Sequence, residues 1–134
     1  PVYAECGGLM LLGQTLEDAD GRAHPMAGVF PWKIRLGDRP KIDYVEVTAS
    51  TGHPFVSRGA VARGHVFHYG EMLAEPAASV SRCYRLSPVR QEPIEEGWCR
   101  GRTLASWVHL HFGSNPAWAG AFVAACRGSG GGDS

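Results

Sequence analysis

The feature that most constrains the fold is a short apolar run that ends in a glycine-rich corner. Residues 1–13 read PVYAECGGLMLLG, in which the β-prone run Val2–Ala4 leads into Glu-Cys-Gly-Gly. Apolar residues with helical spacing follow. A strand, a tight turn and a helix in direct succession form the repeating unit of α/β sheets. The corner therefore predicts an α/β fold, with the helical residues Leu9, Met10, Leu12 and Leu16.

Later segments predict more strands and one further helix. The helix is expected in SNPAWAGAFVAAC, capped by Ser114 or Asn115 with Pro116 in its first turn. Residues 1–127 form one predicted domain, and residues 128–134 a flexible Gly/Ser tail. Segments rich in glycine and proline at residues 28–31 and 37–40 lie on either side of the first predicted strand, Trp32–Leu36. The other predicted strands are Tyr44–Ala49, part of GHVFHYGEML, two hairpin flanks at Cys83–Leu86 and Gly97–Arg102, and RTLASWVHLHF.

Composition excludes several classes of function. The formal net charge is zero, which gives no electrostatic footprint for nucleic acid or an anionic membrane. No apolar run approaches the roughly 20 residues that span a bilayer. The four cysteines are far apart and form no CxxC pair, so a zinc ribbon is not expected. These observations predict a cytoplasmic protein with reduced cysteines.

Cys6, at the corner, is the candidate nucleophile. A nucleophile on a sharp strand-to-helix turn is exposed above the sheet, and flanking glycines tolerate a strained backbone. The first N–H groups of the helix favour a thiolate there, and the Gly7 N–H can stabilise an oxyanion. The alternative is a buried structural cysteine, which is the interpretation we favour for Cys83, Cys99 and Cys126 because they lack the Gly-Gly context.

A cysteine nucleophile needs a base, and the chain has six histidines. His109 and His111 end the strand ASWVHLHF, at the carboxyl edge where α/β proteins place their sites. Cys6 also follows a strand, so a histidine at this edge can meet it in space. His24 and His53 lie beside prolines in turn-like surroundings and are expected at the surface.

The histidines also permit a metal-binding interpretation. His109 and His111 are two residues apart and would share one face of a strand. With His65, His68 and Cys6 they could form a zinc site. The spacing is loose, however, and no carboxylate lies within two residues of either pair. Metal binding therefore stays an alternative, and the primary prediction has no metal.

Four segments, taken in order, resemble one known family. They are PVYAECGGLMLLG, DYVEVTA, RGHVFHY and LASWVHLHFGSNP. They are similar to the carboxyl-terminal glutamine amidotransferase domain of cobyrinate a,c-diamide synthases and of their relatives that act on hydrogenobyrinate. The resemblance runs from Pro1 to about Cys126. It implies a partial class I, triad-type amidotransferase domain, flavodoxin-like, with three layers around a mixed sheet.

The resemblance also implies an activity. Cys6 matches the nucleophile that attacks the side-chain amide of glutamine, and His109 matches the histidine that activates it, with His111 as the fallback. Ammonia passes to an ATP-using, magnesium-dependent synthetase domain, normally on the same chain, which amidates the a and c carboxylates of the corrin ring. The implied partners are therefore glutamine, that domain and a corrinoid. No cofactor is expected in this chain, since ATP and Mg²⁺ belong to the synthetase domain.

His111 stands where many class I amidotransferases carry a glutamate, as is usual for this branch of them, so the third triad member is unassigned. Three other positions depart from the pattern of the family itself. Val66 replaces the glutamate of GHEF, Gly70 stands where serine is common, and Asp43 where glycine is usual. These departures keep a second hypothesis open, namely a catalytically degenerate module that only docks on a synthetase.

The resemblance further implies that the sequence is a piece of a longer protein. Family members have the ATP-binding domain upstream, and their amidotransferase domain begins before this first strand. The implied upstream part carries a glycine-rich turn expected to supply the other half of the oxyanion hole. Losing one oxyanion donor costs about 10²- to 10³-fold in rate. We therefore expect weak or absent glutaminase activity from this piece alone.

Overall fold

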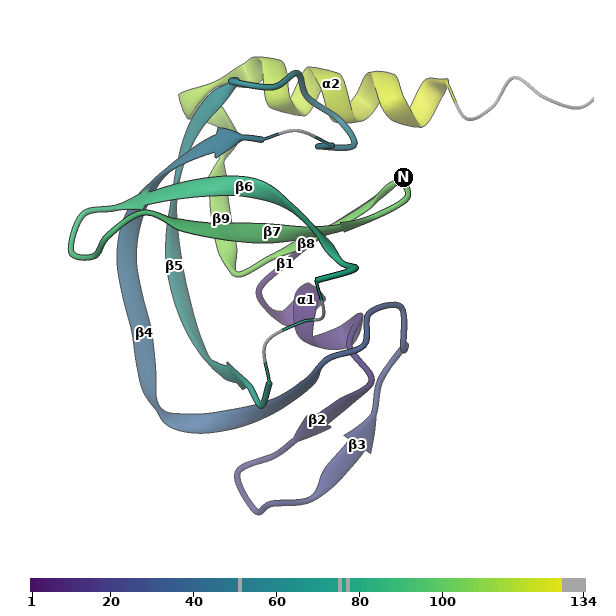
Figure 1. The fold of residues 1–134 in the computed structure, drawn as a ribbon, viewed down its shortest axis with the longest axis vertical. Helices are drawn as coiled ribbons and strands as arrows, with labels where there is room; N and C mark the ends of the chain where they lie inside the picture. The colour runs from purple at the N-terminus through teal and green to yellow at the C-terminus, as the bar shows by residue number, and fades with distance from the viewer. Residues whose placement is uncertain (51, 75, 77, 129–134) are drawn as a thin grey trace, which may run out of the picture.

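The computed structural model describes residues 1–50, 52–74, 76 and 78–128, and within them nine strands form a single sheet. The strand order is β1-β8-β7-β6-β4-β2-β3, and β4 also pairs with β5, which pairs with β9 (Figure 1). The pairs β1–β8 and β2–β4 are parallel and the others antiparallel, so the sheet is mixed. The predicted α/β fold with a mixed sheet is confirmed.

The elements follow one another in the order strand, helix, eight strands, then helix. The strands are β1 (Val2–Glu5), β2 (Thr15–Glu17), β3 (Ala23–Pro25), β4 (Lys33–Ala49), β5 (Val61–Met72), β6 (Ser81–Pro88), β7 (Ile94–Arg100), β8 (Thr103–Ser106) and β9 (Val108–His111). The helices are α1 (Gly7–Leu11), the 3-10 turn η1 (Phe112–Ser114) and α2 (Pro116–Arg127).

The first helix is confirmed but shorter than its apolar spacing predicts. Helix α1 ends at Leu11, and Leu16 lies in strand β2 instead. Gly13 ends the helix against Trp32, whose Cδ1 would lie 2.6 Å from any Cβ at that position. The next residue, Gln14, donates its N–H to the Trp32 carbonyl at 2.8 Å, which turns the chain into β2. Tertiary packing therefore overrides the helical spacing.

The predicted break between the two early strands is wrong. Trp32–Leu36 and Tyr44–Ala49 were expected as separate strands, but β4 runs without interruption from Lys33 to Ala49. It pairs with β5 on both sides of the breaker residues 37–40, and the register shifts between Leu36 and Lys41. An irregularity of this kind absorbs residues that a regular ladder cannot pair.

Two apolar cores lie on opposite faces of the sheet. Successive residues of one strand point to opposite faces, and Trp98 joins one core while Cys99 joins the other. Helix α2 covers one face through the buried Trp118, and α1 covers the other through Leu9. The Asn115 side chain accepts from the Ala117 N–H at 3.2 Å, as the predicted cap requires. No helix among the described residues could cross a membrane, and the predicted tail falls largely on residues 129–134, outside them.

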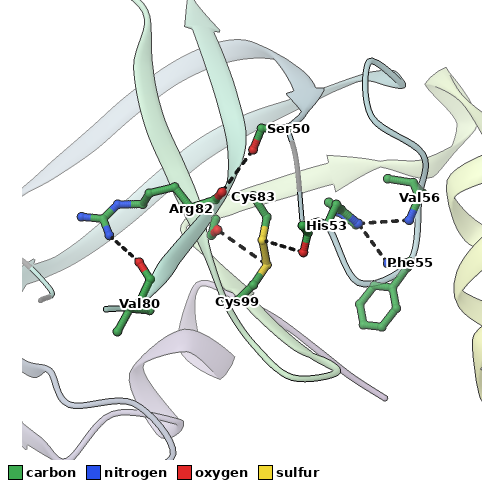
Figure 2. Close-up of a disulfide and its surroundings, with 10 residues drawn as sticks. Ser50, His53, Phe55, Val56, Val80, Arg82, Cys83 and Cys99 are labelled. Carbon is green, nitrogen blue, oxygen red and sulfur yellow. Dashed lines mark hydrogen bonds between the residues drawn. A yellow bond between two sulfur atoms is a disulfide. The ribbon is translucent and has the colours of Figure 1, made fainter. Parts of the chain in front are cut away.

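A disulfide corrects the prediction of reduced, unpaired cysteines. Cys83 on β6 and Cys99 on β7 are bonded to each other, with Cα atoms 6.2 Å apart. Figure 2 shows this bond beside the segment that carries Ser50 and His53. Both cysteines are buried, as predicted, but as a pair. Their separation of 16 residues carries no pairing signal in the sequence. Among the described cysteines, Cys6 and Cys126 are free.

His53 is not at the surface as predicted, whereas His24 is. The His53 ring lies 5.5 Å from that of Tyr84 and 5.4 Å from that of Trp118, measured between centroids. Its Nδ1 accepts from two backbone N–H groups at 3.1 Å (Figure 2). Burial lowers the pKa of His53 to about 4, so the ring stays neutral. His24 is exposed and bonds Asp18 at 2.6 Å.

Candidate active site

Cys6 has the backbone geometry of a nucleophile elbow. Its φ is 47° and its ψ −102°, and among the described residues other than glycine it alone has a positive φ. Such a conformation costs about 1–3 kcal/mol and persists only where the surroundings enforce it. Here the Cys6 N–H donates to the Ser106 carbonyl at 2.8 Å, and the Met10 N–H donates to the Cys6 carbonyl at 3.1 Å. The strain at Cys6 agrees with the predicted corner.

The thiol of Cys6 is half-buried against strand β5. Its Sγ donates to the Phe67 carbonyl at 3.6 Å. Burial raises the pKa of the Cys6 thiol, the Gly7 backbone N–H lowers it, and the neighbouring Glu5 carboxylate raises it again. The net direction is upward, which is opposite to the expectation that the corner favours a thiolate. The thiol therefore needs a base to become a nucleophile.

The two glycines after Cys6 have different roles. A Cβ at Gly8 would lie 3.1 Å from the Ala4 Cβ, so close packing of α1 on β1 favours glycine there. A Cβ at Gly7 would meet no atom within 4 Å. The Gly7 backbone therefore has open space on its side-chain face, which leaves room for a ligand to approach beside the sulfur.

The sheet curls so that β9 returns to β1. The chain bends at Trp107, between β8 and β9, and β9 then pairs with β5 rather than with β8. Glu5, the last residue of β1, accepts a hydrogen bond from the Leu110 N–H of β9 at 2.9 Å. Figure 1 shows β9 turning away from the end of β8 and running beside β5. This curl brings residues about 100 positions apart in sequence to one place.

His109 lies on β9, where this strand approaches the end of β1. Its ring stacks on that of His65 at 4.9 Å between centroids. Its Nδ1 lies 3.9 Å from Oε2 of Glu5, the residue before Cys6. His65 is two residues from Phe67, whose carbonyl accepts the Cys6 thiol, so the cysteine and the histidine contact one short stretch of β5.

His111, the predicted fallback, has different surroundings. It ends β9 in an exposed position, and its backbone carbonyl accepts from the Ser114 hydroxyl at 2.6 Å. Its ring packs near Gly113 rather than against Glu5. The structure thus places His109, rather than His111, beside Glu5, the residue that precedes Cys6.

The histidines of the metal-binding alternative are split between two faces. His65 faces His109, but His68, three residues later, points to the other face and is buried. There its Nδ1 bonds the Gly70 carbonyl at 2.7 Å, and its ring stacks on Trp107 at 3.9 Å. Nowhere in the described part of the chain do three His, Cys, Asp or Glu side chains form a group that could hold a metal ion.

A buried carboxylate that the sequence does not predict lies behind the site. Glu96 on β7 accepts from the Ser106 hydroxyl at 2.6 Å and from the Trp107 N–H at 2.8 Å. The Val108 N–H in turn donates to the Ser106 hydroxyl oxygen at 3.0 Å. Glu96 thereby fixes the bend that precedes His109. Burial raises its pKa to about 7, against the lowering effect of these donors. The surrounding QEPIEEG predicts an exposed acidic loop, so no sequence signal marked it.

The departures from the family pattern lie on the face opposite His109. Val66 and Gly70 alternate with His65 and so point away from it. Val66 packs against both cores. A Cβ at Gly70 would lie 2.7 Å from Trp107 and 3.0 Å from the Met10 sulfur, so a serine does not fit without a shift. Asp43, paired with Val66 in register, is buried as well. None of the three alters the surroundings of Cys6 directly.

Gly64 is expected to be essential for the position of His109. A Cβ on Gly64 would clash with the His109 carbonyl oxygen and would lie 2.7 Å from Cγ1 of Val108. We expect Gly64→Ala to lower the free energy of unfolding by about 1–3 kcal/mol, measured by urea denaturation, because backbone must move. The control is Gly120→Ala in α2, where a Cβ meets nothing within 4 Å. Equal stability of the two variants would contradict this packing.

Comparison with known proteins identifies the family of the chain. The family model for the CobB/CobQ-like glutamine amidotransferase domain matches residues 1–117. The chain is 47% identical over 131 residues to a cobyrinate a,c-diamide synthase of Syntrophotalea carbinolica, covering 96% of this chain and 28% of that protein. Enzymes of the same name from Salmonella typhimurium (41%) and Gloeobacter violaceus (42%) each align with 94% of the chain, which spans 28% and 26% of their lengths. The chain belongs to the CobB/CobQ-like glutamine amidotransferase domain family.

Proposed function

We propose that this chain hydrolyses glutamine and supplies the ammonia for an a,c-diamide synthase of cobalamin biosynthesis. The observation that carries the proposal is the strained Cys6, whose thiol meets β5 next to the point where His65 and His109 stack. A free cysteine in this conformation, which contacts the same stretch of β5 as an imidazole from a distant strand, suits nucleophilic attack on an amide. Family membership favours glutamine as the amide.

The chemistry follows from the positions of three groups. His109 accepts the Cys6 proton, which is needed because burial raises the pKa of that thiol. The thiolate attacks the side-chain amide carbon of glutamine, and the Gly7 N–H stabilises the oxyanion that forms. His109 then donates its proton to the departing nitrogen, so that ammonia leaves and a thioester remains. Water, deprotonated by His109, cleaves the thioester to glutamate and restores Cys6.

The ammonia is consumed outside this chain. The relatives are named for the diamidation of cobyrinate, and the chain spans 28% of the length of the first of them. We assign the ATP- and Mg²⁺-dependent activation of the a and c carboxylates to a synthetase region, normally on the same polypeptide. The corrinoid substrate, cobyrinate or hydrogenobyrinate, would bind there.

Covalent labelling tests the glutaminase assignment without requiring turnover. A chloroketone analogue of glutamine should modify one residue per chain, Cys6, as located by mass spectrometry of peptides. Cys6→Ala should abolish this label, while Cys126→Ala should keep it. Cys126 is the matched control because it is the other free cysteine among the described residues and is exposed to solvent. Free glutamine should slow the labelling, and asparagine should not. Equal labelling of both cysteines, without protection by glutamine, would instead support the docking-module hypothesis.

A further inference from the structure

We propose that Glu5 positions His109, and so fills the role of the acidic triad residue for which position 111 offers only a histidine. This inference rests on the proposed function, in which His109 is the base. The proposal is supported by the position of the Glu5 carboxylate, which lies between the backbone of Cys6 and the ring of His109. Glu5 is next to Cys6 in the chain, and its Oε2 lies 3.9 Å from Nδ1 of His109.

The Glu5 carboxylate is held in a fixed orientation. Its Oε1 accepts from the Tyr3 hydroxyl at 2.5 Å and from the Leu110 N–H at 2.9 Å. Burial raises the pKa of Tyr3 far above its ordinary value, so the phenol remains a donor. With Oε1 occupied by two donors, Oε2 is the oxygen directed at His109. The side chain is 26% exposed, so water screens it only in part.

The two anchors tie Glu5 to both halves of the site. Through the backbone, Glu5 is fixed to the strained Cys6, whose own N–H bonds Ser106. Through Leu110, it is fixed to the residue that follows His109 on β9. A shift of either strand would therefore move the carboxylate, the thiol and the imidazole together. This is how a positioning residue keeps a base in register with its nucleophile.

The chemical consequence concerns the tautomer of His109. A carboxylate at Nδ1 favours a proton on Nδ1, which leaves Nε2 free to accept the proton of the thiol. The separation of 3.9 Å exceeds a hydrogen bond, and catalytic contacts of this kind commonly shorten when substrate binds. The same carboxylate also stabilises the imidazolium that forms when His109 takes the proton.

Glu5 has a second, opposite effect that makes the idea testable. As a negative charge beside the thiol, it raises the pKa of Cys6. If it were only a neighbouring charge, Glu5→Gln would make Cys6 more reactive. If Glu5 positions His109, Glu5→Gln makes Cys6 less reactive, because the His109 ring is no longer held in the orientation that accepts the thiol proton. The direction of the change therefore separates the two roles.

The experiment is alkylation of the full chain by iodoacetamide at pH 7, with Cys6 and Cys126 quantified in the same sample by mass spectrometry. Cys126 serves as the internal reference, because it is exposed and lies in α2. We expect Glu5→Gln to lower the ratio of Cys6 to Cys126 alkylation about tenfold. The matched control, Glu46→Gln, removes an exposed carboxylate from β4 and should leave the ratio unchanged. A ratio that stays constant or rises in Glu5→Gln overturns the proposal.

A second variant and a second readout cover the case in which Glu5→Gln does not fold. Tyr3→Phe keeps the charge of Glu5 but removes one of the two donors that orient it, and should lower the ratio in the same direction by a smaller factor. In ¹⁵N NMR, His109 of the unmodified chain should show the Nδ1–H tautomer, which a purely structural Glu5 would not enforce. An Nε2–H tautomer contradicts the proposal. Neither readout uses glutamine, so Glu5 can fail while the glutaminase assignment stands.

Discussion

Replacing His109 by glutamine should slow the labelling of Cys6 by the glutamine chloroketone about 10²- to 10³-fold at pH 7. The matched variant His111→Gln should change the rate by less than about threefold, since the ring of His111 is exposed and packs near Gly113. Both variants remove one imidazole from the same short strand, β9, and differ only in which residue loses it. Rate constants from stopped samples analysed by mass spectrometry would give the comparison.

The size of this effect follows from the state of the thiol. Burial raises the pKa of Cys6, so at neutral pH little thiolate exists unless a base accepts the proton. The deficit of His109→Gln should therefore shrink as the pH rises toward and above the pKa of the thiol, where hydroxide replaces the missing base. The His111→Gln variant should run parallel to the unmodified chain throughout. A larger loss in His111→Gln than in His109→Gln would show that the base is the fallback residue.

The elements of the site were predictable from the sequence because they depend on local patterns. The Glu-Cys-Gly-Gly corner after an apolar run placed Cys6 at a strand-to-helix turn, and the structure has that turn with a positive φ at Cys6. The period of two in WVHLH predicted one shared face for His109 and His111. The Asn115–Pro116 cap predicted the start of α2, which is confirmed.

What the sequence could not predict depends on long-range packing. The acidic partner of His109 is 104 positions away, and its role appears only when the sheet curls to bring β9 to β1. Glu96 lies in an acidic, Pro-containing segment that reads as solvent-exposed, yet the chain folds it into the bend before His109. The disulfide between Cys83 and Cys99 arises from the pairing of β6 with β7, a register that no local pattern specifies.

Two buried groups behind the site should give stability opposite dependences on pH. His68 is 5% exposed and Glu96 is 4% exposed, and both line a cavity of about 520 Å³ together with Trp98 and Trp107. Burial lowers the pKa of His68 to about 4, partly offset by the Gly70 carbonyl, and raises the pKa of Glu96 to about 7. Their ordinary values are 6.5 and 4.5.

The sign of each contribution follows from which state binds the proton more tightly. The unfolded chain protonates His68 more readily than the folded chain does, so its contribution is present above pH 6.5 and is lost as the pH falls toward 4. The folded chain protonates Glu96 more readily, so its contribution is present below pH 4.5 and is lost as the pH rises through 7. Each amounts to about 3 kcal/mol at its limit. Between pH 4.5 and 6.5 the His68 contribution rises with pH while the Glu96 contribution falls, so the pH dependence of the free energy of unfolding largely cancels.

Single substitutions should separate the two contributions. Relative to the unmodified chain, the free energy of unfolding of Glu96→Gln should rise by about 3 kcal/mol from pH 4.5 to 7, because over this range the unmodified chain loses the Glu96 contribution and the variant does not. That of His68→Gln, again relative to the unmodified chain, should fall by about the same amount from pH 4 to 6.5, because over this range the unmodified chain regains the His68 contribution and the variant does not. Urea denaturation at four pH values measures both, with Glu46→Gln as a control that should show no such slope. If the free energy of unfolding, relative to the unmodified chain, changed with pH in the same direction in both variants, the pKa of at least one of the two groups would not be shifted by burial in the stated direction. Glu96 fixes the bend before His109. If the pH dependence of Glu96→Gln is confirmed, the carboxyl group that holds this bend has a pKa close to neutral pH.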